Sequence, residues 1–321
     1  MGNLKSKNVI VTGGCGFIGS HLVDRLVEEG HKVAVIDNLS GPNGREENLN
    51  PRAKFYKIDI RDTATRKILK KEKAQIVFHL AAHPIVETAY KNPFGCLEVN
   101  IMGTVNVLEG CRIKGDLEAV IVASSDKAYG KAKDLPYKEQ TPLLGDHPYE
   151  VSKTAADLIA QTYFKTYNLP VAITRFGNVF GPRDLYFNRI IPGIFESVIK
   201  NKDLLIRSDG KMIRQFVYVK DVVDGYIKIA EKIDKIKGEA FNFGSEGIFN
   251  VLEVIARIEK ILNKKISYKI LDIAKNEIPE QRLDWTKAKT MLGWQPKTRF
   301  EEAIKETFDW YKNFYFNKFI S

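Results

Sequence analysis

The chain has 321 residues with 44% apolar and 28% charged side chains, which is enough for a globular protein of two domains or one large one. No apolar run approaches the roughly 20 residues needed to span a bilayer, and the three cysteines lack metal-ligand spacing, so we expect reduced thiols, a cytoplasmic location, no membrane contact and no metal site. The net charge of +10 comes from scattered lysines rather than a basic run interleaved with aromatics, which argues against nucleic acid and favours an anionic substrate.

The first half of the chain alternates short β-branched runs with helical patterns. The expected strands are Asn8–Thr12, Lys32–Ile36, Lys54–Asp59, Ile76–Leu80, Ala119–Ala123 and Val171–Arg175. The expected helices are Phe17–Glu29, Thr63–Lys71, Phe94–Cys111 and Tyr149–Tyr167. This alternation predicts an α/β fold with a Rossmann-like, doubly wound parallel sheet.

After Gly181-Pro182 the alternation loosens into helices separated by short strands and turns. The expected helices are Arg189–Lys200, Val219–Lys232, Val251–Asn263, Thr286–Leu292 and Glu301–Phe316. We therefore expect a dinucleotide-binding domain over residues 1–180 and a smaller mixed α/β substrate domain over residues 181–321, with some segments interleaved.

A glycine-rich loop, residues 12–19 (TGGCGFIG), follows the first strand and opens the first helix. Glycines permit a tight turn and let the backbone approach a pyrophosphate, which the helix N-terminus then faces. Asp37 ends the next strand at the spacing of about 20 residues expected for a carboxylate that binds the adenosine ribose. A purely structural turn is the alternative, but this context favours NAD, and the carboxylate would repel the 2′-phosphate of NADP.

Two further motifs combine hydroxyl, carboxylate, amine and phenol groups. The run Ser124–Gly130 (SSDKAYG) follows the fifth strand, and Tyr149 and Lys153 share one face of the next helix because they are four residues apart. This set suits removal of a proton from a sugar alcohol while a nicotinamide takes hydride. Tyr149 is the expected base, and the Lys153 ammonium together with the positive nicotinamide would favour the phenolate and lower the pKa of the phenol from about 10.

These motifs together resemble the extended short-chain dehydrogenase/reductase family, and more narrowly its nucleotide-sugar epimerases and dehydratases. The motifs are TGGCGFIGSHL, Asp37-Asn38-Leu39, Asp59–Asp62, His79–Ala82, the Tyr149 and Lys153 pair, and Arg282–Pro296. The resemblance covers nearly the whole chain and implies bound NAD and a homodimer. It implies cofactor contacts at Gly13, Gly16, Phe17, Ile18, Gly19, Asp37, Asn38, Asp59, Ile60, Leu80, Ala81, Ala82, Asn100, Ser124, Tyr149, Lys153 and Phe176.

Within that family, the pair Asp126 and Lys127 is similar to the Asp-Lys pair of CDP-glucose 4,6-dehydratases, whereas epimerases usually carry small or uncharged residues there. The runs HLAAHPIVETAYKNP and GNVFGPRD extend this likeness. The resemblance selects Ser125 over Ser124 as the catalytic hydroxyl. It also implies substrate contacts at Asn178, Arg189, Arg214 and Arg282. His83 follows the fourth strand, where the loops of such a sheet meet the ligand, so it is either a further substrate contact or a structural residue.

The chemistry gives Asp126 and Lys127 distinct roles. Once C4 of the sugar is a ketone, the C5 proton is acidic, so a base can remove it while an acid protonates the departing C6 hydroxyl. We assign Lys127 as the base and Asp126 as the acid, although the pair could instead be a loop ion pair that shapes the pocket. The sequence thus predicts an NAD-dependent nucleotide-sugar 4,6-dehydratase. A 4-epimerase that needs only Ser125, Tyr149 and Lys153, or a non-catalytic NAD-binding regulator, are the alternatives.

Overall fold

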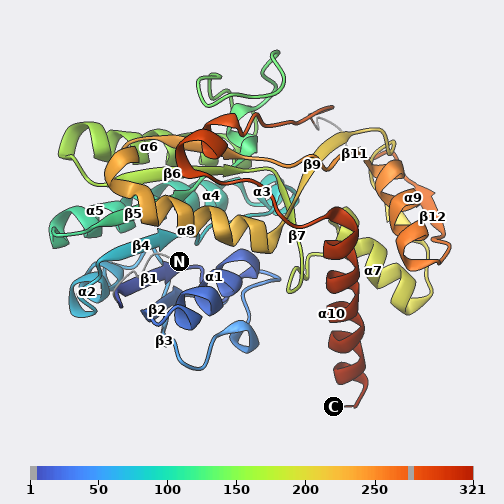
Figure 1. Cartoon of the computed structure of the whole chain (residues 1–321), viewed down its shortest axis with the longest axis horizontal. Coiled ribbons are helices and arrows are strands. Elements are labelled where there is room, and N and C mark those ends of the chain that lie inside the picture. Colours follow the sequence, from blue (N-terminus) through green and yellow to red (C-terminus); the bar gives the residue numbers. More distant parts are fainter. Residues whose placement is uncertain (1–5, 274–277, 321) are drawn as a thin grey trace.

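A computed structural model describes residues 6–273 and 278–320, and its centre is a seven-stranded parallel sheet (Figure 1). The strand order is β10-β6-β5-β4-β1-β2-β3. The bounds are β1 Asn8–Thr12, β2 Lys32–Asp37, β3 Lys54–Lys57, β4 Ile76–His79, β5 Ala119–Ala123, β6 Val171–Phe176 and β10 Ala240–Phe243. The predicted Rossmann-like, doubly wound sheet is confirmed, and its central strands are continuous apolar runs because helices cover both faces.

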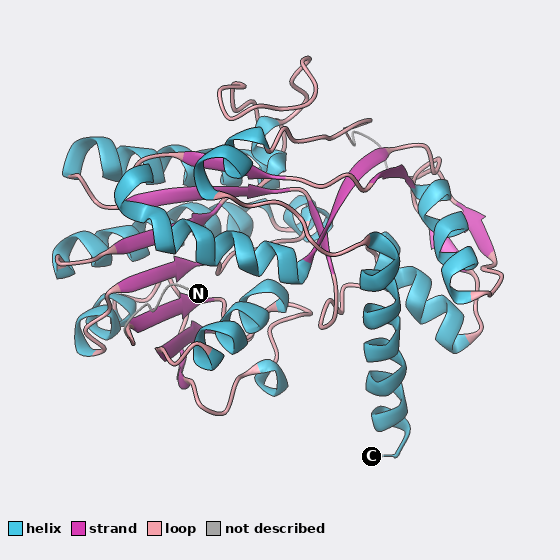
Figure 2. Ribbon diagram, in the orientation of Figure 1, coloured by secondary structure: helices cyan, strands magenta, loops and turns pink. Residues whose placement is uncertain are grey.

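Helices pack on both faces of this sheet, as Figure 2 shows. On one face α1 lies beside α8, and on the other α5 lies between α2 and α6. Their bounds are α1 Phe17–Glu28, α2 Ala64–Lys71, α5 Thr104–Lys114, α6 Pro148–Tyr167 and α8 Val219–Ile236. Each predicted helix of the first half is present, and β3 is shorter than predicted because the chain leaves the sheet after Lys57.

The helix expected at Phe94–Cys111 contains a wider, π-helical turn. It is divided into α4 (Pro93–Leu97), the π-helical η2 (Glu98–Gly103) and α5. Within the wide turn, Asn100 donates to Ser152 Oγ of α6 at 2.8 Å and accepts from the backbone N–H of His83 at 2.6 Å. The turn thus fastens the loop after β4 to the helix that carries Tyr149, and such bulges often lie at functional sites.

The seventh strand, β10, was not predicted. Its four residues are flanked by Gly238 and Gly244 and follow α8, and they pair in parallel with β6 at the edge of the sheet. So short a run carries no periodicity that separates a strand from a loop. Because β10 and α8 lie beyond residue 180 and yet join the large sheet, the chain interleaves there, and the division at residue 180 stays a prediction.

Most of the described elements beyond β6 form a smaller part beside the carboxyl edge of the large sheet (Figure 1), whereas α8, β10 and the π-helical η4 (Ala288–Leu292) pack with the large sheet. The smaller part has a three-stranded sheet and a two-stranded sheet, covered by three helices. The strands are β7 Asn178–Phe180, β9 Ile213–Tyr218 and β11 Ile248–Asn250, then β8 Leu204–Ile206 and β12 Tyr268–Ile270; the helices are α7 Ile190–Lys200, α9 Val251–Leu262 and α10 Phe300–Ile320. A cluster of aromatic and aliphatic side chains from α7, α9 and α10 forms its core.

A buried ion pair fixes α6 on the sheet. Arg175 of β6 donates to both carboxylate oxygens of Asp157 at 2.8 and 2.9 Å, and both side chains are almost fully buried. Removing one partner of such a pair costs about 3–5 kcal/mol, because the other charge is left buried alone. The pair therefore holds in place the helix on which Tyr149 and Lys153 lie.

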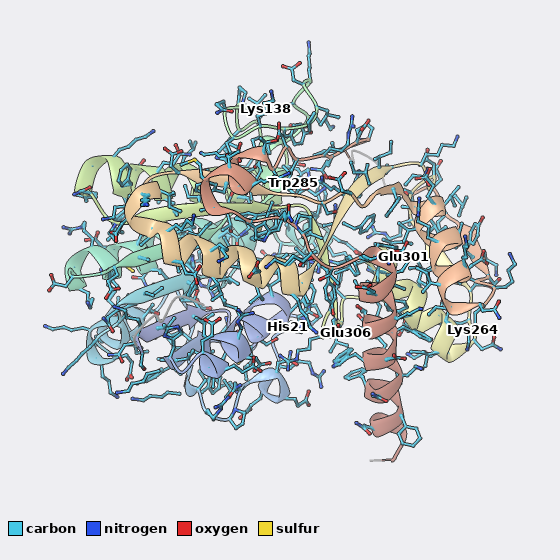
Figure 3. The ribbon with its side chains drawn as sticks, in the orientation of Figure 1. His21, Lys138, Lys264, Trp285, Glu301 and Glu306 are labelled. Atoms are coloured by element: carbon cyan, nitrogen blue, oxygen red, sulfur yellow. The ribbon has the colours of Figure 1, made fainter. Side chains whose placement is uncertain are left out.

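The surface of the described chain carries its positive charge in scattered positions. Lys138 and Lys264, for example, lie far apart on the molecule (Figure 3). No helix in the described part of the chain combines the length and apolar character needed to cross a bilayer.

Candidate active site

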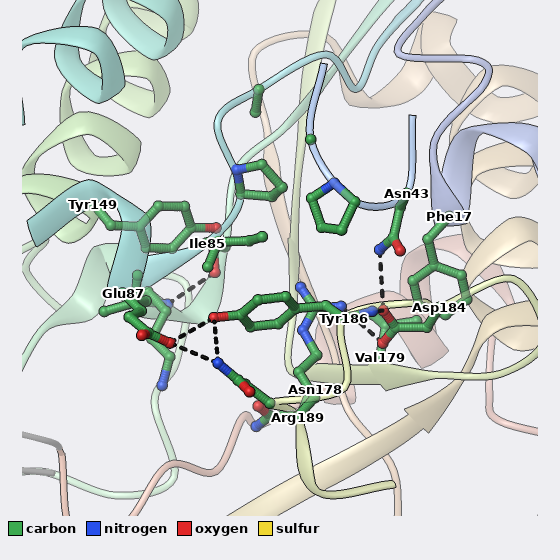
Figure 4. A pocket seen from close by; sticks show the side chains of 18 of the residues that line it. Phe17, Asn43, Ile85, Glu87, Tyr149, Asn178, Val179, Asp184, Tyr186 and Arg189 are labelled. Carbon is green, nitrogen blue, oxygen red and sulfur yellow. Dashed lines mark hydrogen bonds and ion pairs between the residues drawn. The ribbon is translucent and has the colours of Figure 1, made fainter. Parts of the chain in front are cut away.

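A cavity of about 880 Å³ lies between the carboxyl edge of the large sheet and the smaller part. The loops that follow β1, β2, β4, β5 and β6 all contribute to its lining. In a doubly wound sheet this edge is where ligands bind. Figure 4 shows Tyr149 and Glu87 on one side of the cavity, with Phe17 and Asp184 on the other.

The glycine-rich loop has the shape that a dinucleotide requires. Gly13 has a positive φ of 73°, and a Cβ there would lie 2.7 Å from the backbone nitrogen of Ala81. A Cβ on Gly19 would lie 2.1 Å from the carbonyl oxygen of Gly13. Helix α1 begins after Gly16, and no side chain caps its first N–H groups, so they are available to a phosphate.

Asp37, at the end of β2, lines the cavity beside the glycine-rich loop. Its two carboxylate oxygens accept the backbone N–H groups of Cys15 and Leu39 at 2.9 and 2.8 Å. Burial raises the pKa of Asp37, and these N–H donors oppose the rise. Nearby, Asn38 donates to Asp59 at 2.9 Å, and both line the cavity. The fixed carboxylate retains lone pairs for ribose hydroxyls, so the site fits a dinucleotide.

Ser125 lies at the start of the short 3₁₀ turn η3 (Asp126–Tyr129), directly after β5. Its hydroxyl donates to Asp126 Oδ1 at 3.0 Å and accepts the N–H of Lys127 at 3.2 Å, and it lies near enough to Tyr149 to oppose the rise in the pKa of that phenol. The hydroxyl of Ser124 is buried and has no partner among the described residues. The geometry therefore favours Ser125 over Ser124 as the partner of Tyr149.

Burial dominates the titration of Tyr149 and Lys153. It raises the pKa of Tyr149 to about 12, with the Asp126 charge adding to the rise and the Ser125 hydrogen bond opposing it. It lowers the pKa of Lys153 to about 8. The Lys153 ammonium donates to the Ala123 carbonyl at 3.0 Å. The protein's own groups thus raise the pKa of Tyr149, and the predicted lowering by the positive nicotinamide stays a prediction.

Asp126 and Lys127 both line the cavity beside Ser125. Asp126 is only 4% exposed, and burial raises its pKa, which favours the protonated form that a general acid requires. The Lys127 ammonium donates to the side-chain oxygen of Gln281. Within the described chain the two side chains are not within ion-pair distance of each other, and the Lys127 charge opposes the rise in the pKa of Asp126.

Most of the predicted site residues lie on the wall of this one cavity. All five predicted catalytic residues do so, and so do the predicted cofactor contacts except Asn100. Asn100 instead fastens the loop after β4, as described above. The side chains of His83 and Arg282 also lie off the cavity wall, and Arg282 pairs with Glu280 at 2.5 Å.

The substrate end of the cavity holds three of the predicted contacts, namely Asn178, Arg189 and Arg214. The Asn178 side-chain nitrogen is buried and has no hydrogen-bond partner in the described chain, so it can donate to a ligand. Arg189 pairs with the buried Asp184 at 2.9 Å, and its charge partly opposes the rise in the pKa of Tyr149. An arginine held in this way suits a diphosphate.

A polar cluster around Glu87 was not predicted (Figure 4). One oxygen of this carboxylate accepts from Tyr186 at 2.8 Å, from Asn188 at 2.9 Å and from Arg207 at 2.7 Å. All four residues line the cavity. The position of Glu87 in the loop region after the fourth strand is a sequence signal for a site residue. No sequence pattern near Arg207 indicates its contact with Glu87, which lies 120 positions earlier.

Among residues 6–273 and 278–320, no group of three or more His, Cys, Asp or Glu side chains is arranged to hold a metal ion. His79 bonds Thr12 and Thr104 through its two ring nitrogens at 2.8 and 3.0 Å, and burial lowers its pKa to about 3. It is thus a buried strand histidine with both ring nitrogens hydrogen-bonded.

Known proteins with similar sequences include nucleotide-sugar dehydratases and epimerases. The profile of the family described as GDP-mannose 4,6 dehydratase matches residues 10–307. The chain is 32% identical to the dTDP-D-glucose 4,6-dehydratase of Mus musculus, over 97% of this chain and 90% of that protein. It is also 32% identical to the UDP-glucose 4-epimerase of Mycolicibacterium smegmatis, over 95% of this chain and 98% of that protein.

Solved structures of such enzymes also have the same overall fold as this chain. The dTDP-glucose 4,6-dehydratase of Streptomyces venezuelae, determined with NAD bound, is 28% identical and superposes with a TM-score of 0.88 over 95% of this chain and 97% of that one. Dehydratases and epimerases match at similar identity, so similarity alone does not choose between the two reactions. The predicted family and its NAD cofactor are confirmed: the chain belongs to the GDP-mannose 4,6-dehydratase family of NAD-dependent nucleotide-sugar dehydratases and epimerases.

Proposed function

We propose that this protein is an NAD-dependent nucleotide-sugar 4,6-dehydratase. The observation that carries the proposal is that Asp126 and Lys127 line the same cavity as Ser125, Tyr149 and Lys153. An acid and a base beside an alcohol-oxidising set supply the groups that elimination needs after oxidation. Epimerisation has no use for that second pair.

The first step removes a proton from the C4 hydroxyl of the sugar. Tyr149 Oη accepts this proton, and Ser125, which lines the same cavity, orients the hydroxyl. Bound NAD supplies the hydride acceptor and donor, and its oxidised ring brings the positive charge that favours the Tyr149 phenolate. Lys153 lies on the same helix face and can hold the nicotinamide ribose.

The second step eliminates water across C5 and C6. Lys127 Nζ takes the C5 proton, the electron pair of that C–H bond forms the C5–C6 double bond, and the C6–O bond breaks. Asp126 gives its proton to the departing hydroxyl, so water leaves. Lys127 would then return a proton to C5, and with the hydride that a bound NAD would supply at C6 the product would be a 4-keto-6-deoxy sugar. The raised pKa of Asp126 suits this role.

We propose a nucleotide diphosphate sugar as the substrate. Asn178, Arg189 and Arg214 lie along the substrate end of the cavity, where hydrogen-bond donors and positive charge suit a diphosphate. Arg207, which also lines this end, adds a further guanidinium.

Incubation with CDP-, UDP-, dTDP- and GDP-sugars, followed by mass spectrometry, tests the proposed function. A dehydratase converts one of them to a product lighter by one water molecule. A 4-epimerase, which Ser125, Tyr149 and Lys153 alone could support, gives a new sugar of unchanged mass. The second function has support from epimerase relatives at similar identity.

The position of Asp37 leads to a prediction about cofactor choice. Because its carboxylate lies at the cavity wall and would repel a 2′-phosphate, NAD should bind more tightly than NADP. Asp37→Ala should reduce the difference between the dissociation constants for NAD and NADP. It also removes the carboxylate that accepts the backbone N–H groups of Cys15 and Leu39. Dissociation constants for both cofactors, measured at one ionic strength, check the prediction, and tighter binding of NADP by the unmodified protein would contradict it.

We also propose a homodimer formed through α6 and η2. Val151 and Leu158 are seven residues apart on one face of α6 and are 39% and 49% exposed, and the neighbouring η2 exposes Met102 at 55%. Apolar side chains gathered on adjacent helices indicate an interface. Leu158→Glu should therefore convert a dimer to a monomer in light scattering, whereas Leu205→Glu, at an exposed residue of β8, should not. A monomeric unmodified protein at micromolar concentration would contradict this proposal.

A further inference from the structure

Lys127 is held by a residue that lies far away in the sequence. Its ammonium, at the cavity wall, donates a hydrogen bond to the side-chain oxygen of Gln281, 154 positions later. Gln281 is only 1% exposed and does not line the cavity itself. It therefore contacts the proposed base from the side away from the ligand.

The backbone around Gln281 is fixed on two sides. Its N–H donates to the carbonyl of Ile213 at 3.2 Å, next to a bridge between Glu280 and the same strand. On the other side, Tyr137 donates to the carbonyl of Arg282 at 2.8 Å and accepts from Asp284 at 2.9 Å. The side chain of Gln281 thus extends from a segment that cannot shift without breaking these bonds.

The carboxamide of Gln281 uses only its oxygen. Its Nε2 donor is buried and has no hydrogen-bond partner in the part of the chain that the structure describes. A buried donor without a partner is destabilising, and such groups are rare in folded proteins. The side chain is therefore placed for the contact of its oxygen with Lys127 and not for its own hydrogen bonding.

We propose that Gln281 is a positioning residue for Lys127, which rests on the proposed dehydratase function. Both an ammonium and a neutral amine carry N–H groups, so the amide oxygen can hold Lys127 Nζ before and after the C5 proton moves. In the neutral amine this contact uses an N–H and leaves the lone pair for the C5 proton. The contact thereby fixes where the base points during elimination.

Several charged groups act on Lys127 besides Gln281. Among the described residues, Asp126 adjoins it on η3, and Glu150 of α6 is close enough that the Lys127 charge lowers its pKa. Arg214 of β9 acts on Asp126 in turn. None of these three is altered in the variants below, so a change in behaviour reports on residue 281.

Two variants of the NAD-bound enzyme separate positioning from folding. Gln281→Met removes the oxygen at similar length, and it should slow elimination about 10²-fold, the effect of displacing a catalytic group by about 1 Å. Oxidation at C4, read as reduced nicotinamide in the first turnover, should keep its unmodified rate. Gln281→Glu adds a carboxylate against Lys127 and should raise its pKa by about 1–3 units. Because the base must be neutral, the rising limb of the pH profile for elimination should move to higher pH.

The control is Gln161→Met, which removes an amide that bonds Asp157 on α6, outside the cavity. It should leave the ratio of the two step rates unchanged. The probes are the CDP-, UDP-, dTDP- and GDP-sugars that test the proposed function, and thermal unfolding checks each variant. If Gln281→Met does not fold, the pH limb of Gln281→Glu decides.

The outcomes are distinguishable. If the unmodified protein releases no water from any probe, the proposed function fails, and this inference fails with it. If the unmodified protein eliminates water but Gln281→Met does so at the same rate, the positioning role is wrong while the dehydratase stands. The positioning role would also be wrong if Gln281→Met slowed C4 oxidation and elimination equally and Gln281→Glu left the rising limb of the pH profile in place. A residue that only supports the fold would give that result.

Discussion

Tyr149→Phe is expected to lower turnover by about 10²–10⁴-fold, the usual cost of losing a general acid–base group. The hydroxyl moves a proton, whereas the ring supplies the packing, so the fold and the binding of NAD and nucleotide sugar should survive. Steady-state turnover and the dissociation constants of both ligands are the measurements.

Tyr163→Phe is the matched control for this change. It removes a hydroxyl from the same helix, α6, where it bonds Glu109 and not the cavity lining. This control should keep the turnover of the unmodified protein. If Tyr149→Phe stays within a few-fold of the unmodified enzyme, Tyr149 is not the base and another group must take the C4 proton.

Lys127→Met is expected to stop elimination while oxidation at C4 continues. Oxidation depends on Ser125, Tyr149 and Lys153, which the substitution leaves in place. The variant should therefore accumulate reduced nicotinamide on the enzyme when substrate is added, and should release dehydrated product about 10²–10⁴-fold more slowly. Absorbance of the reduced cofactor and mass spectrometry of the product measure the two effects. Asp126→Asn should behave in the same way, since it removes the acid.

Lys131→Met is the control for Lys127. Lys131 lies four residues later and is exposed, so its loss should alter neither step. Full turnover by Lys127→Met would remove its assignment as the C5 base, and the pair would then serve only to shape the pocket.

The dinucleotide half of the site could be predicted because its signals are local. The glycine loop lies between a strand and a helix that are adjacent in sequence, and Asp37 ends the next strand. Ser125, Tyr149 and Lys153 belong to two elements whose ends must meet at one edge of a parallel sheet. Their shared cavity follows from the topology that the alternation predicts.

What could not be predicted depends on contacts between distant segments. The contact of Lys127 with Gln281 spans 154 positions, and that of Glu87 with Arg207 spans 120. No periodicity encodes such pairs. Asn100 was expected at the cofactor, but its amide is used to join the loop after β4 to α6. The raised pKa of Tyr149 likewise depends on burial, which the sequence does not reveal.

The most direct test of dehydration is to run the reaction in deuterium oxide and locate the label in the product. If Lys127 removes the C5 proton, that proton exchanges with solvent before it returns, so the product should be a 4-keto-6-deoxy sugar with deuterium at C5. NMR of the purified product measures this position. A product that keeps the C6 hydroxyl and carries no deuterium at C5 would contradict the dehydratase, because a 4-epimerase never breaks the C5–H bond.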